Sequence, residues 1–388
     1  MISDSPHLYL RDGLAAGVSS ELLATAIQRA YATERHGLRA VLTLNHLAHQ
    51  SGADHGYLRD VVGRSIDPYT GFLLHGKRQI SSPRPPMRAV QRWILRNILS
   101  QVSCHPASFA YERHKSIAQC ARRHVGASWL IKLDLHDFFS SIDERQVFAV
   151  FSGLGYGKLV SFEMSRLCTR QGIGAQYKVS WTESISSARY PAIWKYRTSG
   201  GLGYLPQGSP TSGALANLVM RDTDIRISEA IAGTGIVYTR YADDIVFSTS
   251  GPFSRREASD LILMTDKLLR HNGFMRHENK TRVIPPGARK IVLGLLVDGD
   301  LVRIPGDARR RLLNDIRGAE KFGLPNHAQH RGFSSMIAFG ERMAGMLAYC
   351  HDVDPEWTAP LWGRWVRVLM EHNVPLKFTR REGSGRTL

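Results

Sequence analysis

The spacing of apolar and polar positions predicts that the chain begins with helices. Apolar residues recur at helical spacing over 21–47 and again over 87–102, so both stretches are expected to form helices. Between them, 71–86 is basic and interrupted by Gly and Pro, which is typical of a hairpin or loop. A mostly apolar run over 129–133 predicts a buried strand, followed by a turn and by a helix over about 144–151.

The pattern changes in the second half of the chain. The stretch 171–204 is rich in Gly, Ser and aromatic residues without a clear period, and we interpret it as a long insertion. Residues 205–220 predict a tight turn that feeds a helix, with small residues allowing close backbone approach. Residues 235–240 and 245–248 are β-branched and aromatic, and predict two short strands joined by a tip. From residue 301 onward the chain is predicted to be helical.

Two adjacent aspartates, Asp243 and Asp244, occupy the tip between these two strands. Such a pair is common in ordinary turns, where aspartate accepts hydrogen bonds from the backbone. Here the neighbours are strand-forming residues, and adjacent carboxylates repel and raise each other's pKa. A divalent cation removes this conflict, and Mg²⁺ prefers oxygen ligands. From this stretch alone, a metal site and a plain hairpin turn are equally open interpretations.

The charge of the chain indicates a polyanionic partner. Its 388 residues, 43% of them hydrophobic, are enough for one large or two to three smaller lobes. Lys and Arg number 51 against 34 Asp and Glu, a net charge of +17. This excess favours nucleic acid over a merely soluble basic protein, and its even spread favours a folded basic surface over a disordered arm.

The cysteine spacing and the hydropathy pattern exclude other classes of protein. None of the four cysteines forms a C-x-x-C pair, so reduced thiols in a cytoplasmic protein are expected. The first residues lack a basic region followed by an apolar run, and no stretch approaches 18 apolar residues. Neither a signal peptide nor a membrane span is therefore expected.

A further carboxylate, Asp134, follows the predicted strand over 129–133, and Asp137 comes three residues later. The chain thus offers acidic side chains at the ends of separate strands. Two-metal nucleotidyl transfer needs this arrangement, because carboxylates from neighbouring strands hold two divalent ions roughly 3.5–4 Å apart. In such chemistry the protein mainly positions the reactants and neutralises their charge.

Three motifs in order, LDLHDFF, LPQGSPTSGALANL and YADD, resemble the palm motifs of reverse transcriptases, and ENKTRVI and IVLGLLVDG follow them. Within that superfamily, RQISSP, VQRWILRNIL and HVGASWLIKLDLHDFFSSI are most similar to bacterial retron reverse transcriptases. The resemblance covers about 69–349. It implies an α+β right-hand polymerase fold, with N-terminal helices and fingers over 1–125, a palm with an antiparallel sheet over 126–300 (insertion about 171–204) and a helical thumb over 301–388.

The resemblance also assigns catalytic roles. Asp134, Asp243 and Asp244 would form the catalytic triad that binds two Mg²⁺ ions, with Mn²⁺ as an alternative. Phe139, five residues after Asp134, matches the steric gate that excludes a 2′-hydroxyl and selects dNTPs. The other interpretation of Phe139 is a core phenylalanine.

Further nucleotide-binding residues are implied by the same resemblance. Arg78 matches the fingers arginine that grips the triphosphate, and Lys77 would either help it or be an ordinary solvated lysine. Asp137 would line the triphosphate pocket, and Gln207 would contact the incoming nucleotide and the template. Lys280 would lie near the pyrophosphate and could act as general acid.

Basic residues in two segments are expected to bind RNA. In the C-terminal part, four arginines lie on one or two adjacent helix faces, which suits a thumb that grips duplex phosphates, although a solvated face is the alternative. These are Arg309, Arg310, Arg311 and Arg317. In QCARRH, Arg122, Arg123 and His124 fall within an element that the resemblance associates with retron RNA. A structural histidine is an equally weighted interpretation of His124.

Two motifs depart from the retron pattern. Cys120 stands where that pattern has Asn, and Leu293, in the primer-grip segment 292–297, stands where it has Thr. Polymerase chemistry is not affected by these changes. They leave open whether this is an orthodox retron enzyme or a related defence-associated reverse transcriptase.

The resemblance implies an RNA-directed DNA polymerase that copies a cognate noncoding RNA into short single-stranded DNA, an msDNA-like RNA–DNA hybrid, in antiviral defence against phage. Its implied partners are the template RNA and DNA product, dNTPs and a separate effector or toxin protein. An alternative from another class is an RNA-binding scaffold that restrains an effector without turnover. The complete set of catalytic residues argues against that alternative, and a group II intron maturase is disfavoured because no His-Asn-His nuclease motif is present.

Overall fold

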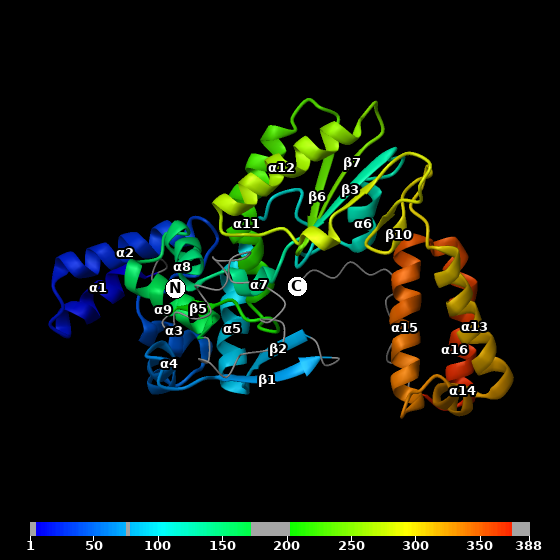
Figure 1. Cartoon of the computed structure of the whole chain (residues 1–388). Coiled ribbons are helices and arrows are strands. Elements are labelled where there is room, and N and C mark those ends of the chain that lie inside the picture. The colour runs from blue at the N-terminus through cyan, green and yellow to red at the C-terminus, as the bar shows by residue number, and fades with distance from the viewer. Residues whose placement is uncertain (1–4, 75–77, 172–201, 375–388) are drawn as a thin grey trace. The chain divides into compact units, whose positions relative to one another are not determined.

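The computed structural model describes residues 5–74, 78–171 and 202–374 (Figure 1). Lys77 and nearly all of the expected insertion lie outside the described residues. The chain divides into two compact units. The first comprises Met1–Lys115, Ile131–Val246 and Phe253–Val283, and the second comprises Ser116–Leu130, Phe247–Pro252 and Ile284–Leu388.

The first unit begins with four helices, not with the continuous helix predicted over 21–47. That prediction is wrong because the chain turns at Gly37, whose φ of 73° is a left-handed conformation. A new helix then starts where the Thr43 side chain accepts a hydrogen bond from the His46 amide, at 3.1 Å. The four helices are α1 Pro6–Ala15, α2 Ser20–Glu34, α3 Leu44–Ser51 and α4 His55–Val62.

The basic segment at 71–86 forms a hairpin that leads into a helix. Strands β1 (Tyr69–Leu74) and β2 (Arg78–Pro83) pair antiparallel. Helix α5 (Pro85–Asn97) follows at once, and its Pro residues suit the first turn, where no amide donor is needed. The helix predicted over 87–102 ends earlier, at Asn97, and a short 3-10 turn η1 (Leu99–Gln101) follows it.

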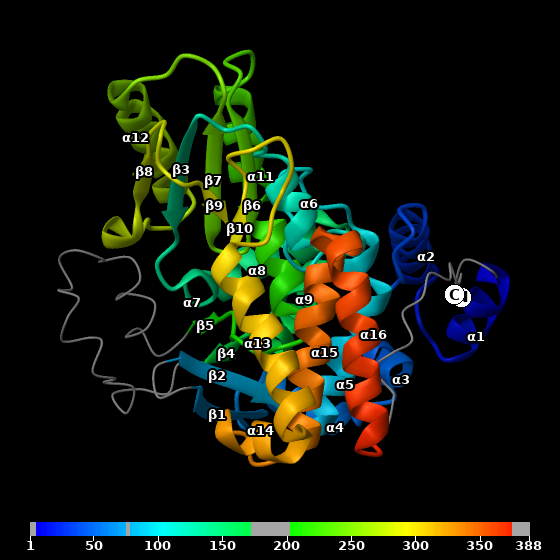
Figure 2. The same ribbon diagram turned by 90° about the vertical axis from the view of Figure 1, so that its right-hand side faces the viewer.

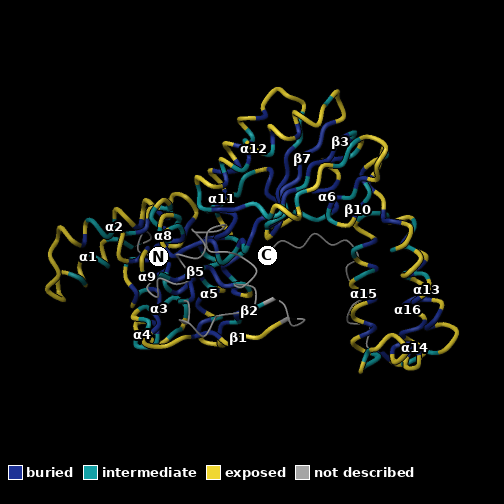
Figure 3. Tube along the Cα trace, in the orientation of Figure 1, coloured by how far each residue is buried: buried dark blue, intermediate teal, exposed yellow. Residues whose placement is uncertain are grey.

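A four-stranded sheet with the order β6-β7-β3-β8 carries the acidic motifs. The strands are β3 Trp129–Asp134, β6 Val237–Tyr241, β7 Asp244–Thr249 and β8 Arg282–Ile284. Apolar side chains make β3 and β7 buried strands, as the sequence predicted (Figure 3). Helices α11 (Ser212–Ala230) and α12 (Arg255–His271) pack together, and Figure 2 shows strands β3, β7 and β6 side by side.

Short helices and a small hairpin complete the first unit. They are α7 Phe138–Ser141, α8 Glu144–Gly153, α9 Lys158–Cys168, β4 Arg170–Gln171, β5 Gly203–Tyr204 and the 3-10 turn η4 Glu278–Lys280. Strands β4 and β5 pair antiparallel, so Gln171 faces Gly203. The Glu144 carboxylate accepts hydrogen bonds from the Gly203 amide, at 3.1 Å, and from Arg64, at 2.5 Å. The two ends of the insertion are thereby fixed to the folded unit.

The second unit is mainly helical at its C-terminal end, as predicted after residue 301. Phe339 and Trp365 meet edge to face, with ring centroids 5.9 Å apart, inside its core. Among the described residues, no helix combines the length and the apolar character needed to cross a membrane. The elements are α6 Ile117–Arg122, β9 Ile291–Val292, β10 Leu295–Leu296, α13 Gly306–Phe322, α14 Leu324–His330, α15 Met336–Val353 and α16 Pro355–Glu371.

Candidate active site

The aspartates of the two acidic motifs lie next to each other because of main-chain pairing. Asp134 is the last residue of β3, and the amide of the next residue, Leu135, donates to the Asp243 carbonyl at 3.1 Å. Asp243 lies in the turn after β6, and Asp244 opens β7. Burial raises the pKa of Asp244, and the charges of Asp243 and Asp134 raise it further, against the opposite effect of nearby lysines. The site therefore concentrates negative charge.

Lys280 neutralises part of this charge. Its ammonium lies 2.9 Å from Asp134 Oδ2, and 57% of the Lys280 side chain is exposed. The lysine comes from η4, and main-chain pairing holds this segment against β3, since the His277 amide donates to the Asp134 carbonyl at 2.7 Å. The structure thus brings the predicted general acid to the predicted triad.

The same carboxylates are the candidate ligands for divalent cations. The described residues contain no group of three or more His, Cys, Asp or Glu side chains that could hold a metal ion in their present conformations. The donor chemistry nevertheless fits, because Asp134, Asp243 and Asp244 are hard oxygen ligands. The raised pKa of Asp244 is also a penalty on its charge that a bound cation would relieve. Lys280 lies 2.9 Å from one oxygen of Asp134, so it would compete with a cation for that oxygen.

The turn that carries the aspartate pair is backed by a buried ionic network that the sequence analysis missed. Arg240 and Asp224 are both fully buried, with Nη2 and Oδ2 2.7 Å apart. The Arg240 guanidinium also donates to the Ala242 carbonyl at 3.2 Å, and the Tyr238 hydroxyl donates to Asp224 at 2.7 Å. Burial and Asp224 raise the pKa of Tyr238 well above its usual value, so its hydroxyl remains a donor.

The Arg240 contacts explain how the turn keeps its shape. Ala242 has a φ of 56°, a left-handed conformation that costs energy for any residue with a side chain. Because Arg240 fixes the carbonyl of this residue, the network holds the turn in place. The one sequence signal for it was an arginine inside an otherwise apolar strand.

Phe139 and Phe138 have different environments. Phe138 is 3% exposed and lies 5.8 Å from the Phe274 ring, so it belongs to the core. Phe139 is half-buried, and its ring lies edge-on to Tyr111 with centroids 6.0 Å apart. The preceding turn depends on Asp137, whose φ is 48° and whose carboxylate lies 3.1 Å from His136 Nδ1. Phe139 is therefore more open than Phe138, and its role as the gate stays a prediction.

Gln207 is tied to the strand that carries Arg78. The Ser81 amide in β2 donates to the Gln207 carbonyl at 2.7 Å. Gly208 is needed here, because its φ is 111° and an added Cβ would lie 3.0 Å from the Ser81 carbonyl. Arg78 is the first residue of β2, so the main chain links both predicted nucleotide-binding residues.

The predicted RNA-binding residues near 122–124 are not alike. His124 is 1% exposed, and its Nδ1 lies 2.7 Å from Ser248 Oγ. Burial lowers its pKa to about 4, helped by Arg123, so the ring stays neutral. The structure thus favours the structural interpretation of His124 over direct RNA contact. Arg122 and Arg123 are exposed, and Arg122 donates to the Asp352 carbonyl at 2.7 Å.

The four arginines of α13 also differ in their contacts and exposure. Arg309 pairs with Asp354 at 2.6 Å, and its guanidinium lies 4.6 Å from the centre of the Trp357 ring, so intramolecular contacts occupy it. Arg311 is exposed and pairs with a neighbour one turn earlier on the helix. Arg310 and Arg317 are exposed and seven residues apart, which places them on one helix face.

Comparisons with known proteins identify the family of the chain. The family model for reverse transcriptase (RNA-dependent DNA polymerase) matches residues 74–294. The Retron Ec86 reverse transcriptase of Escherichia coli is 29% identical over 277 residues, which cover 71% of this chain and 72% of that protein. The Retron Mx162 reverse transcriptase of Myxococcus xanthus is 31% identical over 370 residues, which cover 88% of this chain and 71% of that protein.

Likeness to solved structures is weaker. The telomerase from Candida albicans in complex with a fragment of telomeric RNA is similar with a TM-score of 0.38 and 11% identity. The match covers 79% of this chain and 63% of that chain. A TM-score this low supports no conclusion about this chain.

Proposed function

We propose that this chain, which belongs to the reverse transcriptase family and is of the retron type, copies one cognate structured noncoding RNA. The chain is an RNA-directed DNA polymerase with an α+β right-hand fold. The product would be a short single-stranded DNA, part of an msDNA-like RNA–DNA hybrid. We further propose that this hybrid acts in defence against phage and engages a separate effector protein. Both relatives reported above are retron enzymes, which favours this class over a non-retron defence-associated enzyme.

The observation that carries the proposal is the meeting of the two acidic motifs. The Leu135–Asp243 main-chain hydrogen bond of 3.1 Å sets the end of β3 beside the turn after β6. Lys280 adds a cation at 2.9 Å from Asp134. An RNA-binding scaffold has no need to bring these carboxylates together, because burial and the neighbouring carboxylates disfavour the charge of Asp244 and raise its pKa.

Each nearby residue has a part in the proposed reaction. Asp134, Asp243 and Asp244 would hold two Mg²⁺ ions, with Mn²⁺ as an alternative, which would supply charge neutralisation and activation of the attacking hydroxyl. Gln207 would orient the incoming dNTP against the template. Lys280 would keep a proton on Nζ for the departing pyrophosphate.

The other residues would select and hold the nucleotide. Phe139 would present its ring edge where a ribonucleotide carries its 2′-hydroxyl. Arg78, with Lys77, would grip the triphosphate, and Asp137 would line that pocket. Arg122, Arg123, Arg310, Arg311 and Arg317 would contact RNA or duplex phosphates. In this proposal residues 1–125 are the fingers region, 126–300 the palm and 301–388 the thumb.

The test is to express the chain with its native flanking DNA, purify it, and sequence the bound nucleic acid with and without RNase. A short DNA of one sequence joined to a structured RNA supports the proposal. An Asp243→Asn variant is the matched control and should retain the RNA but carry no DNA. RNA alone on the wild-type protein, or long repetitive DNA, would contradict the retron-type product.

A further inference from the structure

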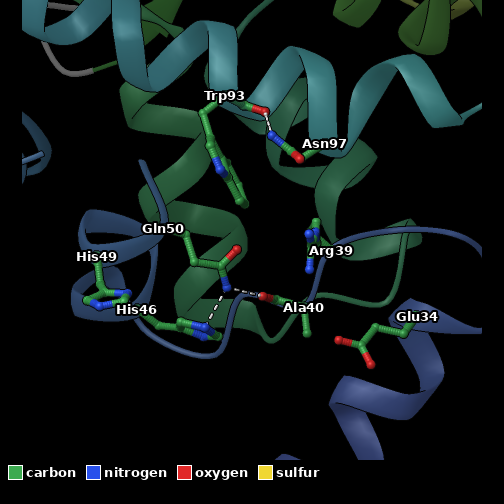
Figure 4. A pocket seen from close by; sticks show the side chains of 8 residues that line it. All are labelled: Glu34, Arg39, Ala40, His46, His49, Gln50, Trp93 and Asn97. Carbon is green, nitrogen blue, oxygen red and sulfur yellow. Dashed lines mark hydrogen bonds between the residues drawn. The ribbon is translucent and has the colours of Figure 1, made fainter. Parts of the chain in front are cut away.

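A polar cavity of about 440 Å³ lies among the N-terminal helices of the first unit, outside the site described above. Its walls come from α2, α3, α5 and the turn between α2 and α3, and they include Glu34, Arg39, Gln50, Trp93 and Asn97 (Figure 4). The volume falls within the range of about 300–1,000 Å³ that is usual for small-molecule sites.

Glu34 makes this cavity unusual. Its Oε2 atom is buried and accepts no hydrogen bond from the described residues. Glu34 is also the last residue of α2, where the helix carbonyls already carry partial negative charge. A buried carboxylate oxygen without a donor is costly, and the helix terminus adds to the cost. A ligand that brings N–H donors to this carboxylate would remove that cost.

The opposite wall offers an aromatic face. Figure 4 shows the Trp93 ring extending from α5 into the space between Gln50 and Arg39. Gln50 is held in place, because its Nε2 donates to the Ala40 carbonyl at 3.0 Å and lies 2.5 Å from His46 Nε2. Aromatic rings and guanidinium planes are the surfaces on which proteins stack unpaired bases.

Arg39 gives the lining of the cavity a cationic side chain. Arg39 is exposed, and its main chain is fixed by the Tyr156 hydroxyl, which donates to the Arg39 carbonyl at 2.7 Å. Arg92 and Arg96 are exposed on α5, the helix that supplies Trp93. A nucleotide in the cavity would therefore find partners for its phosphates close to its base.

We propose that this cavity binds an unpaired guanine nucleotide of the RNA partner. The base stacks on Trp93, its N1–H and N2–H donate to the Glu34 carboxylate, and a flanking phosphate meets Arg39. Guanine fits because two adjacent donors on its Watson–Crick edge match the two acceptor oxygens of a carboxylate. The RNA origin of the nucleotide rests on the proposed function, because loops of a folded RNA expose unpaired bases.

The test measures binding of short RNA to the full chain without dNTPs. Fluorescein-labelled uridine octamers with one central G, A, C or U are titrated by fluorescence anisotropy. We expect the G octamer to bind roughly tenfold more tightly than the others, as for other carboxylate or amide contacts to base edges. Glu34→Gln should abolish this preference, and Trp93→Leu should weaken binding of the G octamer roughly tenfold.

Controls separate this site from folding and from catalysis. Glu21→Gln changes an exposed carboxylate on the same helix and should leave the preference intact. Trp93→Phe keeps a stacking face and should keep most of the affinity. Glu34→Gln should extend a pre-annealed primer–template at the wild-type rate. If the proposed polymerase function is wrong, the wild-type protein itself will not extend the primer, whereas a failure of the guanine site leaves primer extension unchanged.

Two results would overturn the inference. Equal affinity for all four RNA octamers would remove guanine as the ligand, as would a preference that survives Glu34→Gln. Tighter binding of the DNA octamer with the same base sequence would show that the guanine nucleotide does not come from RNA.

Discussion

The Arg240 guanidinium and the Asp224 carboxylate form a fully buried ion pair directly behind the turn that carries Asp243. Two hydrogen bonds of 2.8 and 2.7 Å join them in a forked geometry that lysine cannot reproduce. Both residues lie away from the solvent, so their contribution is to shape and not to substrate contact.

Asp224→Asn should therefore lower the free energy of unfolding by about 3–5 kcal/mol, since it leaves the Arg240 charge buried without its counterion. The measurement is denaturant unfolding, with DNA synthesis as a second readout. Asp222→Asn on the same helix, whose carboxylate is exposed in an i,i+4 pair, is the matched control and should cost less than about 1 kcal/mol. Equal effects of the two changes would contradict the role of the network.

Asp244→Asn should abolish DNA synthesis yet raise the melting temperature in EDTA. The pKa of Asp244 is raised above its ordinary value, so the ionised carboxylate destabilises the fold at neutral pH and this cost disappears as pH falls through the raised pKa. The stability gain of the variant should therefore shrink in acid. Mg²⁺ should raise the melting temperature of the wild type more than that of the variant. A variant that is less stable than the wild type in EDTA would contradict this explanation.

Lys280→Ala should lower the maximal rate of nucleotide addition by roughly 10²-fold, within the range for loss of a general acid. Single-turnover extension of a pre-annealed primer–template measures it. Lys267→Ala on α12 is a control for lost positive charge and should have little effect. If Lys280 only balances Asp134, the variant would instead need less Mg²⁺ and keep its maximal rate.

Phe139→Ala should admit ribonucleotides, because it removes the half-buried ring beside Tyr111. The ratio of dNTP to rNTP incorporation measures the effect. Phe138→Leu is the paired control, since Phe138 is 3% exposed, and it should cost stability without changing sugar selection. An unchanged ratio in Phe139→Ala would remove this residue from the gate.

Leu293→Asn should stabilise the second unit by about 0.5–1 kcal/mol. Leu293 has a φ of 49° and Gly294 a φ of 85° in the turn that joins β9 to β10. Asn tolerates such left-handed conformations better than a bulky side chain does. Thermal unfolding measures the gain, and a loss of stability would mean that contacts of the half-buried leucine outweigh its strain.

The sequence predicted features that depend on residues close together in the chain. Asp134, Asp243 and Asp244 were singled out because they stand beside apolar, strand-forming runs, and the turn and helix around Gln207 followed from local residue types. The Arg240–Asp224 pair could not be predicted, because its partners lie 16 residues apart and its depth depends on tertiary packing. The break at 35–43 was missed because apolar residues keep their helical spacing across Gly37. Burial of His124 likewise depends on contacts with Ser248, far away in the chain.

The pairing of β4 with β5 has a consequence for how such a chain can change over time. Gln171 and Gly203 are partners across an antiparallel ladder, and the Glu144 carboxylate accepts a hydrogen bond from the Gly203 amide. Whatever lies between them starts and finishes at the same place on the framework. That segment can therefore be lengthened, shortened or exchanged for another without altering the span that its ends must bridge. The β4–β5 hairpin is therefore a position at which evolution can exchange a segment, and with it a binding specificity, while the catalytic framework stays the same.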